Sequence, residues 1–474
     1  MSLLNRISQH ISDGRGQSIA CYCQGEALTY QALADAVVER QGQLQPQAAA
    51  RQLCALALQA NVANLITYLA CLAANIPLLL LDSEQAPALT QKLLRQYQVA
   101  WWLDRVEPGA NADNALVLKD VALPIASALA APIRADLALL MSTSGSTGSP
   151  KCVMLSQANL VSNAESICQY LPITAAHCAI TSLPLHYSYG LSVLNSHLWC
   201  GGAIVLTQEP LMSREFWRLM QVHQVNSLAG VPFSYQMLKT LRIERMSLPS
   251  LQYLTQAGGK LPAALVAHFT QVAATAGWEL YLMYGQTEAT ARMAYLPPAL
   301  LACHADCIGQ AIPGGRLWLE DEQGQEITAA NVMGELHYQG ANVMLGYALD
   351  GNDLLGDQYC SQLATGDLAL MTADGLFKIV GRKSRFLKIR GKRFGLDHID
   401  SQLQQISAGA IAVTGQDELL IIAHEHASDA ELITDYCHQL GLHPSLFACR
   451  HLPSLPRLSN GKLDYPRIRA EGLA

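Results

Sequence analysis

A polar segment between two apolar runs has the composition of an anion-binding loop. The segment STSGSTGSPK, residues 142–151, combines hydroxyl side chains with two glycines and ends in Lys151. Such residues expose backbone N–H groups and O–H donors, which suit a ligand with several anionic oxygens, and phosphate is the usual one. The lysine adds a positive point charge. We expect a phosphate-binding loop between two buried strands; the alternative, a flexible surface linker, is disfavoured by the apolar flanks at 137–141 and 153–155.

This loop differs from two widespread motifs. The nucleotide-triphosphatase pattern G-x-x-x-x-G-K-[ST] requires a glycine directly before the lysine, whereas Pro150 precedes Lys151 and Cys152 follows it. The sequence also lacks the G-x-S-x-G elbow of serine hydrolases. A phosphate ligand would therefore be bound by a different arrangement of groups.

Composition limits the class of protein. A chain of 474 residues predicts two or three domains. Because 50% of the residues are hydrophobic and 15% are charged, the chain can bury a sizeable core, and disorder is disfavoured. The net charge of −7 gives no general attraction to nucleic acid.

The cysteines and the amino-terminal residues bear on the cellular compartment. Thirteen cysteines are scattered without a C-x-x-C pair. Cys303 and Cys307, with His304 between them, give the one hint of a metal site, and buried thiols more often explain such spacing. Free thiols and the absence of a signal-peptide pattern predict the reducing cytoplasm.

The longest apolar region, 53–81, could suggest a membrane span. It is interrupted by polar residues and by Pro77, whereas a span needs about 20 nearly uninterrupted apolar residues. We therefore expect a strand, a buried helix and a second strand here, and no membrane span.

Regular elements must position the loop. Strand and helix patterns alternate up to about residue 290, which predicts an α/β architecture with two mostly parallel sheets. One example is the helix expected after Ser156, its N-cap. Short strands and recurring glycines at about 305–380 predict a β-rich subdomain, with a hairpin at 371–377. Seven Arg or Lys residues lie within 381–395, and a small α+β domain is expected beyond them.

The loop resembles the signature of the adenylate-forming superfamily. That superfamily includes acyl-CoA synthetases, aryl-CoA ligases, peptide-synthetase adenylation domains and firefly luciferase. The resemblance implies an ATP site in which the loop grips the β- and γ-phosphates. The residues assigned to this role are Thr143, Ser144, Gly145, Ser146, Thr147, Gly148 and Lys151.

Further segments match in the same order along nearly the whole chain. YGQTEAT, residues 284–290, resembles the segment for adenine and magnesium. The match implies that Tyr284, followed by Gly285, stacks on adenine and that Thr287 binds the α-phosphate. Glu288 would hold Mg²⁺, a hard cation that prefers oxygen ligands.

Two more segments complete the expected nucleotide site. AGGKLP matches a glycine turn, in which Gly258 and Gly259 let the backbone lie against the purine and the acyl group. GELHYQG, residues 334–340, matches a structural strand. TGDLA carries Asp367, whose carboxylate would accept both ribose hydroxyls, and Arg382 would reach the ribose from the other side.

The last match, PRLSNGKLD, places the catalytic lysine of the family at Lys462. A carboxylate that attacks the α-phosphorus of ATP gives an acyl adenylate and pyrophosphate. Both reactants are anions, so the site must align them and neutralise their charge. The carboxylate is already ionised at neutral pH and needs no general base. The resemblance places Lys462 between the two anions.

A second half-reaction would pass the acyl group to a phosphopantetheine thiol. The resemblance implies that the small domain, 382–474, rotates against the ATP- and acyl-binding domain, 1–381, with Ser384 at the hinge. The thiol would belong to CoA or to a carrier protein. Aspartate at position 464 and the short terminal domain favour a carrier protein slightly, and both acceptors stay open.

The segment LPLHYSYGLS, residues 183–192, resembles the motif that lines the acyl pocket. It holds His186 and Tyr187 and no acidic residue, which disfavours an α-amino acid. The other pocket candidates are small or apolar and suit a modest aliphatic or aromatic acid, although core packing explains them equally: Gly230, Val231, Pro232, Ala257, Gly258 and Met283.

Two other functions remain open. An inactive relative could bind nucleotide or acyl groups as a sensor, although the residues such a relative would lose, Lys462, Glu288 and Asp367, are all present. A luciferase-like oxygenase would use the same adenylate for oxidation. The sequence does not indicate the oligomeric state.

Overall fold

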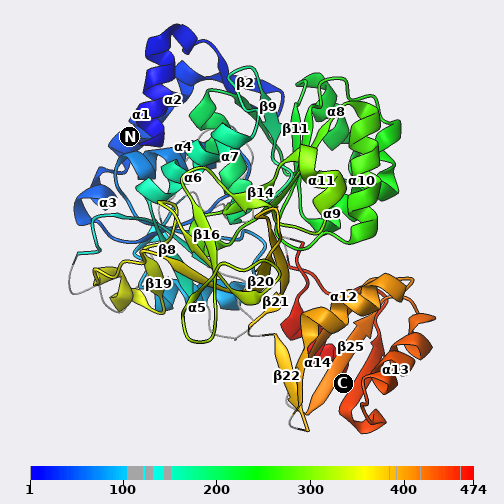
Figure 1. The fold of residues 1–474 in the computed structure, drawn as a ribbon. Helices are drawn as coiled ribbons and strands as arrows, with labels where there is room; N and C mark the ends of the chain where they lie inside the picture. The colour runs from blue at the N-terminus through cyan, green and yellow to red at the C-terminus, as the bar shows by residue number, and fades with distance from the viewer. Residues whose placement is uncertain are drawn as a thin grey trace.

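The chain forms a larger body followed by a smaller one, as Figure 1 shows for this computed structural model. The larger body includes every element up to β21, and the smaller body, coloured orange to red, holds the carboxyl-terminal elements. The structure describes residues 2–103, 121–122, 132–142, 151–383, 385–390, 392–416, 418–458 and 461–473.

A seven-stranded sheet carries the two strands that flank the predicted phosphate loop. Its strand order is β19, β8, β7, β4, β3, β5 and β6. These strands span Gly346–Ala348, Cys152–Ser156, Leu137–Ser142, Leu78–Leu81, Cys54–Ala57, Trp101–Leu103 and Val121–Ala122. The strands β7, β4, β3 and β5 run parallel, whereas β8 lies antiparallel to both β7 and β19. Buried parallel strands require apolar side chains on both faces, which explains the run LLLL in β4.

A nine-stranded sheet brings several of the other predicted segments to one edge. Its order is β15, β14, β13, β12, β11, β9, β10, β1 and β2. They span Gln310–Ala311, Ala294–Leu296, Glu279–Tyr284, Tyr253–Gln256, Ser227–Gly230, Cys178–Ile180, Ala203–Leu206, Ile19–Cys23 and Glu26–Thr29. Strands from β13 to β1 are parallel, and the outer pairs are antiparallel. The carboxyl ends of β11, β12 and β13 therefore lie together, at the edge where open α/β sheets bind ligands.

Helices α6 (Gln157–Tyr170) and α7 (Ser188–Cys200) pack against each other. One buried cluster joins their apolar faces to strands of both large sheets. The predicted N-cap of α6 is confirmed, because the Ser156 hydroxyl accepts a hydrogen bond of 3.1 Å from the backbone N–H of Asn159.

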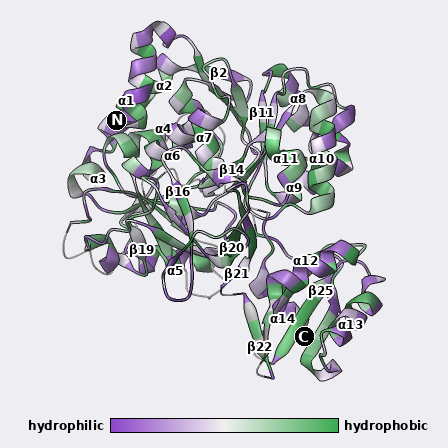
Figure 2. Ribbon diagram, viewed as in Figure 1, coloured by the Kyte–Doolittle hydropathy of each residue, from purple (hydrophilic) through white to green (hydrophobic). Residues whose placement is uncertain are grey.

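The remaining helices of the larger body cover its sheets (Figure 1). They are α1 (Leu3–His10), α2 (Tyr30–Gln43), α3 (Gln45–Ala50), α4 (Val62–Ala73), α5 (Pro87–Gln96), α8 (Arg214–Val222), α9 (Pro232–Leu241), α10 (Ala263–Ala276) and α11 (Leu301–His304). Figure 2 shows apolar strands inside and mixed polarity on the outer helices, the pattern expected for helices with one face on a core.

A five-stranded antiparallel sheet follows the nine-stranded one. Its order is β17 (Glu326–Ile327), β16 (Arg316–Glu320), β18 (Met333–Gln339), β20 (Leu363–Met371) and β21 (Phe377–Arg382). The predicted hairpin at 371–377 is confirmed: β20 and β21 pair from Met371 opposite Phe377 to Asp367 opposite Arg382. Gly375 lies in the left-handed region that the turn needs.

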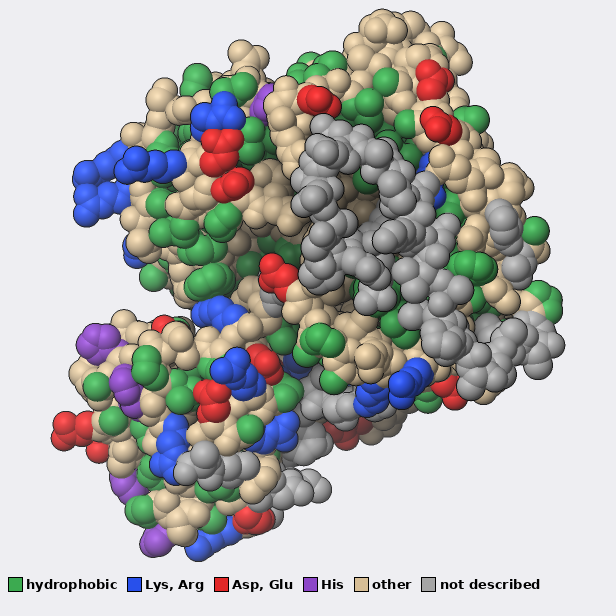
Figure 3. Space-filling view, turned by 180° about the vertical axis from the view of Figure 1, so that it is seen from behind, with side chains coloured by type: hydrophobic (Ala, Val, Ile, Leu, Met, Phe, Trp, Pro, Cys, Tyr) green, Lys and Arg blue, Asp and Glu red, His purple; other side chains and the backbone are tan. Residues whose placement is uncertain are grey.

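The smaller body has its own buried apolar cluster. It contains the hairpin β22 (Phe386–Ile389) and β23 (Lys392–Gly395), and a sheet of β24 (Ile411–Gln416), β25 (Leu419–His424) and β26 (Phe447–His451). Helices α12 (Leu396–Ile406), α13 (Asp429–Gln439) and α14 (Tyr465–Leu473) complete it. Figure 3 shows the two bodies from behind, with a notch between them that closes toward the middle of the molecule.

The α/β fold class is confirmed, and the thiol prediction needs one correction. Cys168 and Cys200, which α6 and α7 carry, form a disulfide. The expectation of free thiols is therefore wrong for this pair, which the packing of two successive helices brings together. Cys307 is buried as expected, whereas Cys303 is exposed. Among the helices of the described ranges, none has the length and apolar character that a membrane crossing requires.

Candidate active site

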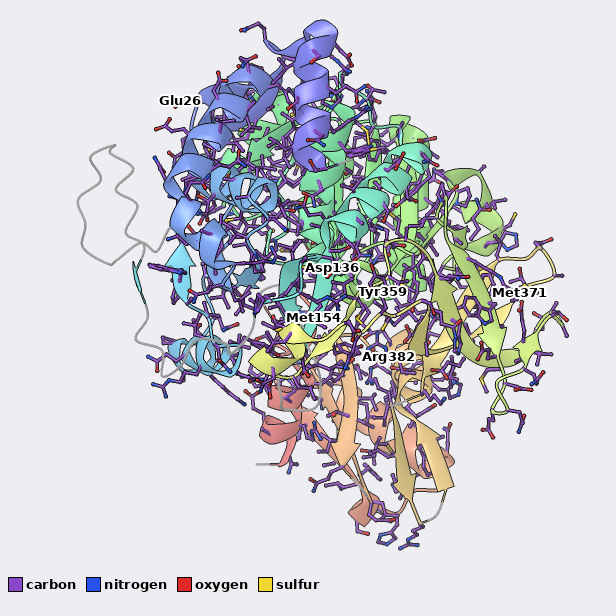
Figure 4. The ribbon with its side chains drawn as sticks, turned by 90° about the vertical axis from the view of Figure 1, so that its left-hand side faces the viewer. Glu26, Asp136, Met154, Tyr359, Met371 and Arg382 are labelled. Atoms are coloured by element: carbon purple, nitrogen blue, oxygen red, sulfur yellow. A yellow bond between two sulfur atoms is a disulfide. The ribbon has the colours of Figure 1, made fainter. Side chains whose placement is uncertain are left out.

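Asp367 is the centre of a buried polar network that joins three predicted segments. Its side chain is 3% exposed, and its carboxylate accepts hydrogen bonds from Tyr284 Oη (2.5 Å), Gln286 Nε2 (3.0 Å) and Arg382 Nε (2.8 Å). Tyr284 ends β13, whereas Asp367 and Arg382 face each other across β20 and β21. Figure 4 labels Arg382 near the junction of the two bodies.

The network fixes the orientation of Tyr284. Burial, reinforced by the charge of Asp367, raises the pKa of Tyr284 well above its ordinary value, so the phenol stays protonated and donates to the carboxylate. Gln286 also donates to the carbonyl of Thr365 at 3.0 Å. Removing one member of such a network leaves a buried partner unsatisfied.

Gly285 shapes the turn that presents the next residues. A Cβ atom at this position would lie 1.7 Å from the carbonyl oxygen of Ala291, so only glycine fits. The turn leads into the 3₁₀ helix Thr287–Ala289. Its carboxyl end is held by Asn342, which donates to the carbonyl of Ala289 and accepts, through its own backbone carbonyl, from the hydroxyl of Thr290.

Glu288 is held by a residue that we did not predict. Tyr347, in β19, donates to Glu288 Oε1 at 2.7 Å, and the Nζ atom of Lys151 lies 3.6 Å from the centre of the Tyr347 ring. The antiparallel pairing of β19 with β8 brings this ring to the end of the phosphate loop. Thr287 Oγ1 lies 3.3 Å from Ser188 Oγ, at the start of α7.

The residues present fit a magnesium ion that is bound partly by the protein and partly by the phosphate oxygens of a nucleotide. Mg²⁺ commonly takes one or two carboxylates and completes its shell with water and substrate phosphate oxygens. Glu288 offers one carboxylate, and no group of three metal-ligating side chains occurs within the ranges that the structure describes. A site that depends on the phosphates of a bound nucleotide matches this set.

The loop that carries Lys462 lies on the larger body. Gly461, with a φ of 79°, approaches so closely that a Cβ atom would lie 2.9 Å from Val231 Cγ2. Arg457 stacks over the ring of Phe233, with its Cζ atom 4.4 Å from the ring centre. These contacts hold a loop of the smaller body against the carboxyl end of β11.

The Lys462 side chain thereby reaches the predicted site. Its Nζ atom lies 5.5 Å from the ring centre of Tyr187. Burial and the charge of Arg382 lower the pKa of Lys462, while Glu288 and Asp367 act in the opposite direction. Both carboxylates belong to the larger body, Glu288 in the 3₁₀ helix after β13 and Asp367 in β20.

Three of the predicted acyl-pocket residues belong to one buried cluster, against which Tyr187 packs. Val231, Ala257 and Met283 are buried in it, and Tyr187 packs against them. A Cβ atom on Gly258, whose φ is 82°, would lie 2.6 Å from the Tyr187 hydroxyl. The glycine turn therefore leaves the space that the tyrosine occupies.

Two other predicted glycines allow close packing nearby. A Cβ atom on Gly230 would lie 3.0 Å from side-chain atoms of Ser234 and Tyr235, and one on Gly259 would lie 3.3 Å from Pro232. The residues at the start of α9 therefore leave little room for a side chain at either position.

His186 faces a different neighbour. Its Nε2 atom lies 3.6 Å from the carboxylate of Asp82, which follows β4. Burial lowers the pKa of His186, and Asp82 and Glu84 oppose that effect. Within the described ranges, no hydrogen bond, ion pair or ring contact joins His186 to the Tyr187 cluster, so its place in the acyl pocket stays a prediction.

Some predicted residues cannot be placed. Six residues of the phosphate loop and the hinge residue lie outside the described residues: Thr143, Ser144, Gly145, Ser146, Thr147, Gly148 and Ser384. Tyr347, Gln286 and Arg292 were missed by the sequence analysis. A charged residue in the apolar context ARMAYL was the one available signal for Arg292.

The chain is similar in sequence to several known proteins. Tenellin synthetase from Beauveria bassiana is 27% identical over 410 residues, which is 77% of this chain and 10% of that protein. L-proline--[L-prolyl-carrier protein] ligase from Pseudomonas fluorescens is 28% identical over 353 residues, 69% of this chain and 67% of the ligase. A long-chain-fatty-acid–CoA ligase from Salmonella typhimurium is 28% identical over 357 residues, 71% of this chain and 62% of that enzyme. The chain thus spans a tenth of the synthetase and about two thirds of the two ligases.

The fold and the family agree as well. The structure of O-succinylbenzoate Coenzyme A Synthetase (MenE) from Bacillus subtilis, in complex with AMP, superposes with a TM-score of 0.79 at 22% identity, over 98% of this chain and 97% of that one. That likeness shows a shared fold. A family model described as AMP-binding enzyme matches residues 9–348. Because this match covers well over half of the sequence, the chain belongs to the AMP-binding enzyme family.

Proposed function

We propose that the protein activates a small carboxylic acid with ATP and transfers the acyl group to a phosphopantetheine thiol. The first step gives acyl-AMP and pyrophosphate; the second gives a thioester and AMP. The observation that carries the proposal is the position of Lys462. Its Nζ atom, from the smaller body, lies 5.5 Å from the ring centre of Tyr187, and Glu288 and Asp367 of the larger body oppose the lowering of its pKa by burial.

The described residues have the charges that adenylation requires. Asp367, fixed by Arg382 and Tyr284, offers carboxylate oxygens to the ribose hydroxyls, and Tyr284 offers a ring to the purine. Thr287 would donate to the α-phosphate. Lys462 would lie between that phosphate and the incoming carboxylate, where its charge offsets the repulsion between them.

Glu288 is the residue that would hold Mg²⁺. The ion, when bound, neutralises charge on the phosphate oxygens as pyrophosphate leaves. Tyr347 keeps the Glu288 carboxylate in place by donating to one of its oxygens. Lys151, stacked over the same ring, would add a second positive charge where the phosphate loop ends.

Thioester formation requires a different placement of the smaller body. The loop at Gly461 lies on Val231, so a thiol could not reach an adenylate from that side while the loop stays there. We propose that residues 382–474 turn against residues 1–381 about a hinge at Ser384. This motion would withdraw Lys462 after the first step.

The acceptor is either CoA or a carrier protein. Among the relatives, one ligase acts with a carrier protein and another with CoA, as their names state. Both acceptors present the same phosphopantetheine thiol. The Gly-Lys-Leu-Asp sequence around Lys462 supports the carrier protein slightly.

Exchange of pyrophosphate into ATP, measured with a panel of carboxylic acids, tests the first step. We expect exchange that depends on one class of acid and falls by at least about 100-fold in Lys462→Ala, the scale seen when a group that stabilises the transition state is removed. Arg450→Ala, which removes an exposed charge of the same body, should leave exchange unchanged. Acid-dependent exchange that survives in Lys462→Ala would contradict the proposal.

A further inference from the structure

Arg292 is a buried charge without a countercharge. The residue is 2% exposed, and no carboxylate forms an ion pair with it among the residues that the structure describes. Its Nε atom is buried and has no hydrogen-bond partner there. The Nη1 atom lies 2.5 Å from the sulfur of Met283, a weak acceptor. A guanidinium cannot neutralise itself by losing a proton, so its burial is unfavourable unless an anion joins it.

The backbone of Arg292 is firmly held. Asn163, from α6, donates to its carbonyl at 3.0 Å, and Asn342 donates to the same carbonyl at 2.9 Å. Two buried asparagines from separate segments thus fix where this residue lies. The backbone at Arg292 is therefore anchored to α6 and to the segment that holds Asn342.

The surroundings of the guanidinium are the walls of the acyl pocket. Its Cζ atom lies 4.2 Å from the ring centre of Tyr189, which belongs to the same buried cluster as Met283 and Val231. Burial raises the pKa values of Tyr170, Tyr187 and Tyr189, and Arg292 counteracts that effect at each. These phenols therefore stay neutral at physiological pH and supply no anion. Stacking on Tyr189 offsets only part of the desolvation cost.

Arg292 and Lys462 stand at opposite ends of a short aromatic path. Lys462 Nζ lies 5.5 Å from the ring centre of Tyr187, and the ring centres of Tyr187 and Tyr189 are 6.3 Å apart. Tyr189 in turn contacts the guanidinium. An acid whose reacting carboxylate lies near Lys462 would extend along these rings toward Arg292.

We propose that Arg292 binds a second carboxylate at the far end of the substrate, so that this enzyme activates a dicarboxylic acid. This inference rests on the proposed function for the reacting carboxylate, and it names the class of acid. A planar guanidinium can donate two parallel hydrogen bonds to a carboxylate, and the unpartnered Nε atom is one of the donors this geometry uses. Monocarboxylic acids of the same length would leave that donor and the charge unsatisfied.

The test combines two readouts, so that this inference and the proposed function fail separately. Equilibrium binding of acids without ATP is measured by calorimetry, and pyrophosphate exchange is measured with the same acids. The probes are pairs matched in length: succinate with butyrate, glutarate with valerate, adipate with hexanoate, and terephthalate with benzoate. The proteins are the full-length wild type, Arg292→Met, Arg292→Lys and, as a control, Arg245→Met, which removes an exposed arginine.

We expect one diacid to bind the wild type roughly 100-fold more tightly than its monoacid partner, the scale of a buried charge pair. Arg292→Met should lose that preference and keep its binding of the monoacid, Arg292→Lys should keep part of it, and Arg245→Met should match the wild type. The melting temperature of Arg292→Met without ligand should not be lower than that of the wild type, because the substitution removes a buried charge that has no countercharge.

Other results would overturn the inference. Equal binding of diacids and monoacids by the wild type, or an equal loss of both in Arg292→Met together with a lower melting temperature, would make Arg292 a structural residue. Exchange with monoacids alone would overturn the inference and keep the proposed function. Arg292-dependent binding of a diacid without exchange would support the binding site and refute the proposed function.

Discussion

Asp400 provides a prediction whose sign and size follow from its surroundings. This carboxyl, in α12, accepts a hydrogen bond of 3.2 Å from the backbone N–H of Val413. Burial raises the pKa of Asp400 to about 7; Arg385 opposes this, Asp397 adds to it, and the Val413 N–H opposes it. Arg385 is already occupied, because it pairs with Asp397 at 2.7 Å and donates to Tyr465 at 3.1 Å.

The sign of the pH dependence follows from the direction of this shift. The ordinary pKa of an aspartate is 3.8, and burial raises that of Asp400 to about 7. Between those two values the folded protein holds a proton that the unfolded chain releases. The contribution of Asp400 to stability is therefore full below about pH 4 and is lost as the pH rises toward about 7. The pKa difference of about 3 corresponds to a loss of up to about 4 kcal/mol.

The substitution Asp400→Asn removes the titration and keeps an oxygen that can accept from Val413. At pH 8 we expect the free energy of unfolding of the variant to exceed that of the wild type by about 2–4 kcal/mol. At pH 4 the two should be nearly equal. Urea unfolding followed by far-UV circular dichroism measures this, because all six tryptophans precede the smaller body and fluorescence would not report its unfolding directly.

The control is Asp435→Asn, which changes an exposed carboxylate in α13 of the same body. Its stability should follow the wild type at every pH. If Asp400→Asn and the wild type showed the same pH dependence from pH 4 to pH 8, the assigned burial of Asp400 would be wrong.

Three further substitutions test the site. Asp367→Asn removes the charge that fixes Arg382, so the ATP dissociation constant, measured by calorimetry, should rise roughly tenfold to 100-fold; an unchanged constant would remove Asp367 from the nucleotide site. Gly285→Ala places a methyl group 1.7 Å from the carbonyl oxygen of Ala291. The free energy of unfolding, measured by thermal unfolding, should therefore fall by at least about 1–3 kcal/mol. A melting temperature equal to that of the wild type would contradict the turn described. Gly461→Ala puts a side chain in a left-handed conformation, which costs about 1–2 kcal/mol, and directs it at the larger body. Pyrophosphate exchange should slow about tenfold, and the melting temperature should fall by no more than this strain implies. Exchange at the wild-type rate would show that this contact does not deliver the lysine.

Local features of the fold could be predicted from the sequence because they depend on neighbouring residues. The polar loop between two apolar runs predicted the strands β7 and β8, and the serine before an amphipathic pattern predicted the N-cap of α6. The turn at Gly375 was predicted for a similar reason, since a glycine between two short apolar runs favours a hairpin. The spacing of apolar side chains and the residue preferences of turns involve only a few neighbouring positions, so both can be recognised in a single sequence.

The meeting of distant segments could not be derived in that way. Asp367, Tyr284 and Lys462 were assigned through a resemblance, since nothing in their spacing brings β13, β20 and the terminal loop together. Tyr347 was missed because β19 joins its sheet from almost 200 residues away along the chain. His186 was placed in the pocket by the same resemblance, and its neighbour Asp82 comes from another sheet. Arg292 had no local signal beyond its charge, because burial depends on the complete fold.

The seating of Gly461 on Val231 has a kinetic consequence. If the acid enters beside Val231, where Gly461 lies, it has to bind before the loop that carries Lys462, and we expect a compulsory order of binding. An acid too long for the pocket would prevent the Gly461 loop from closing on Val231 and would keep Lys462 away from ATP. Acids that do not fit would then dissociate before any ATP is consumed, which would make the enzyme selective without a separate editing step.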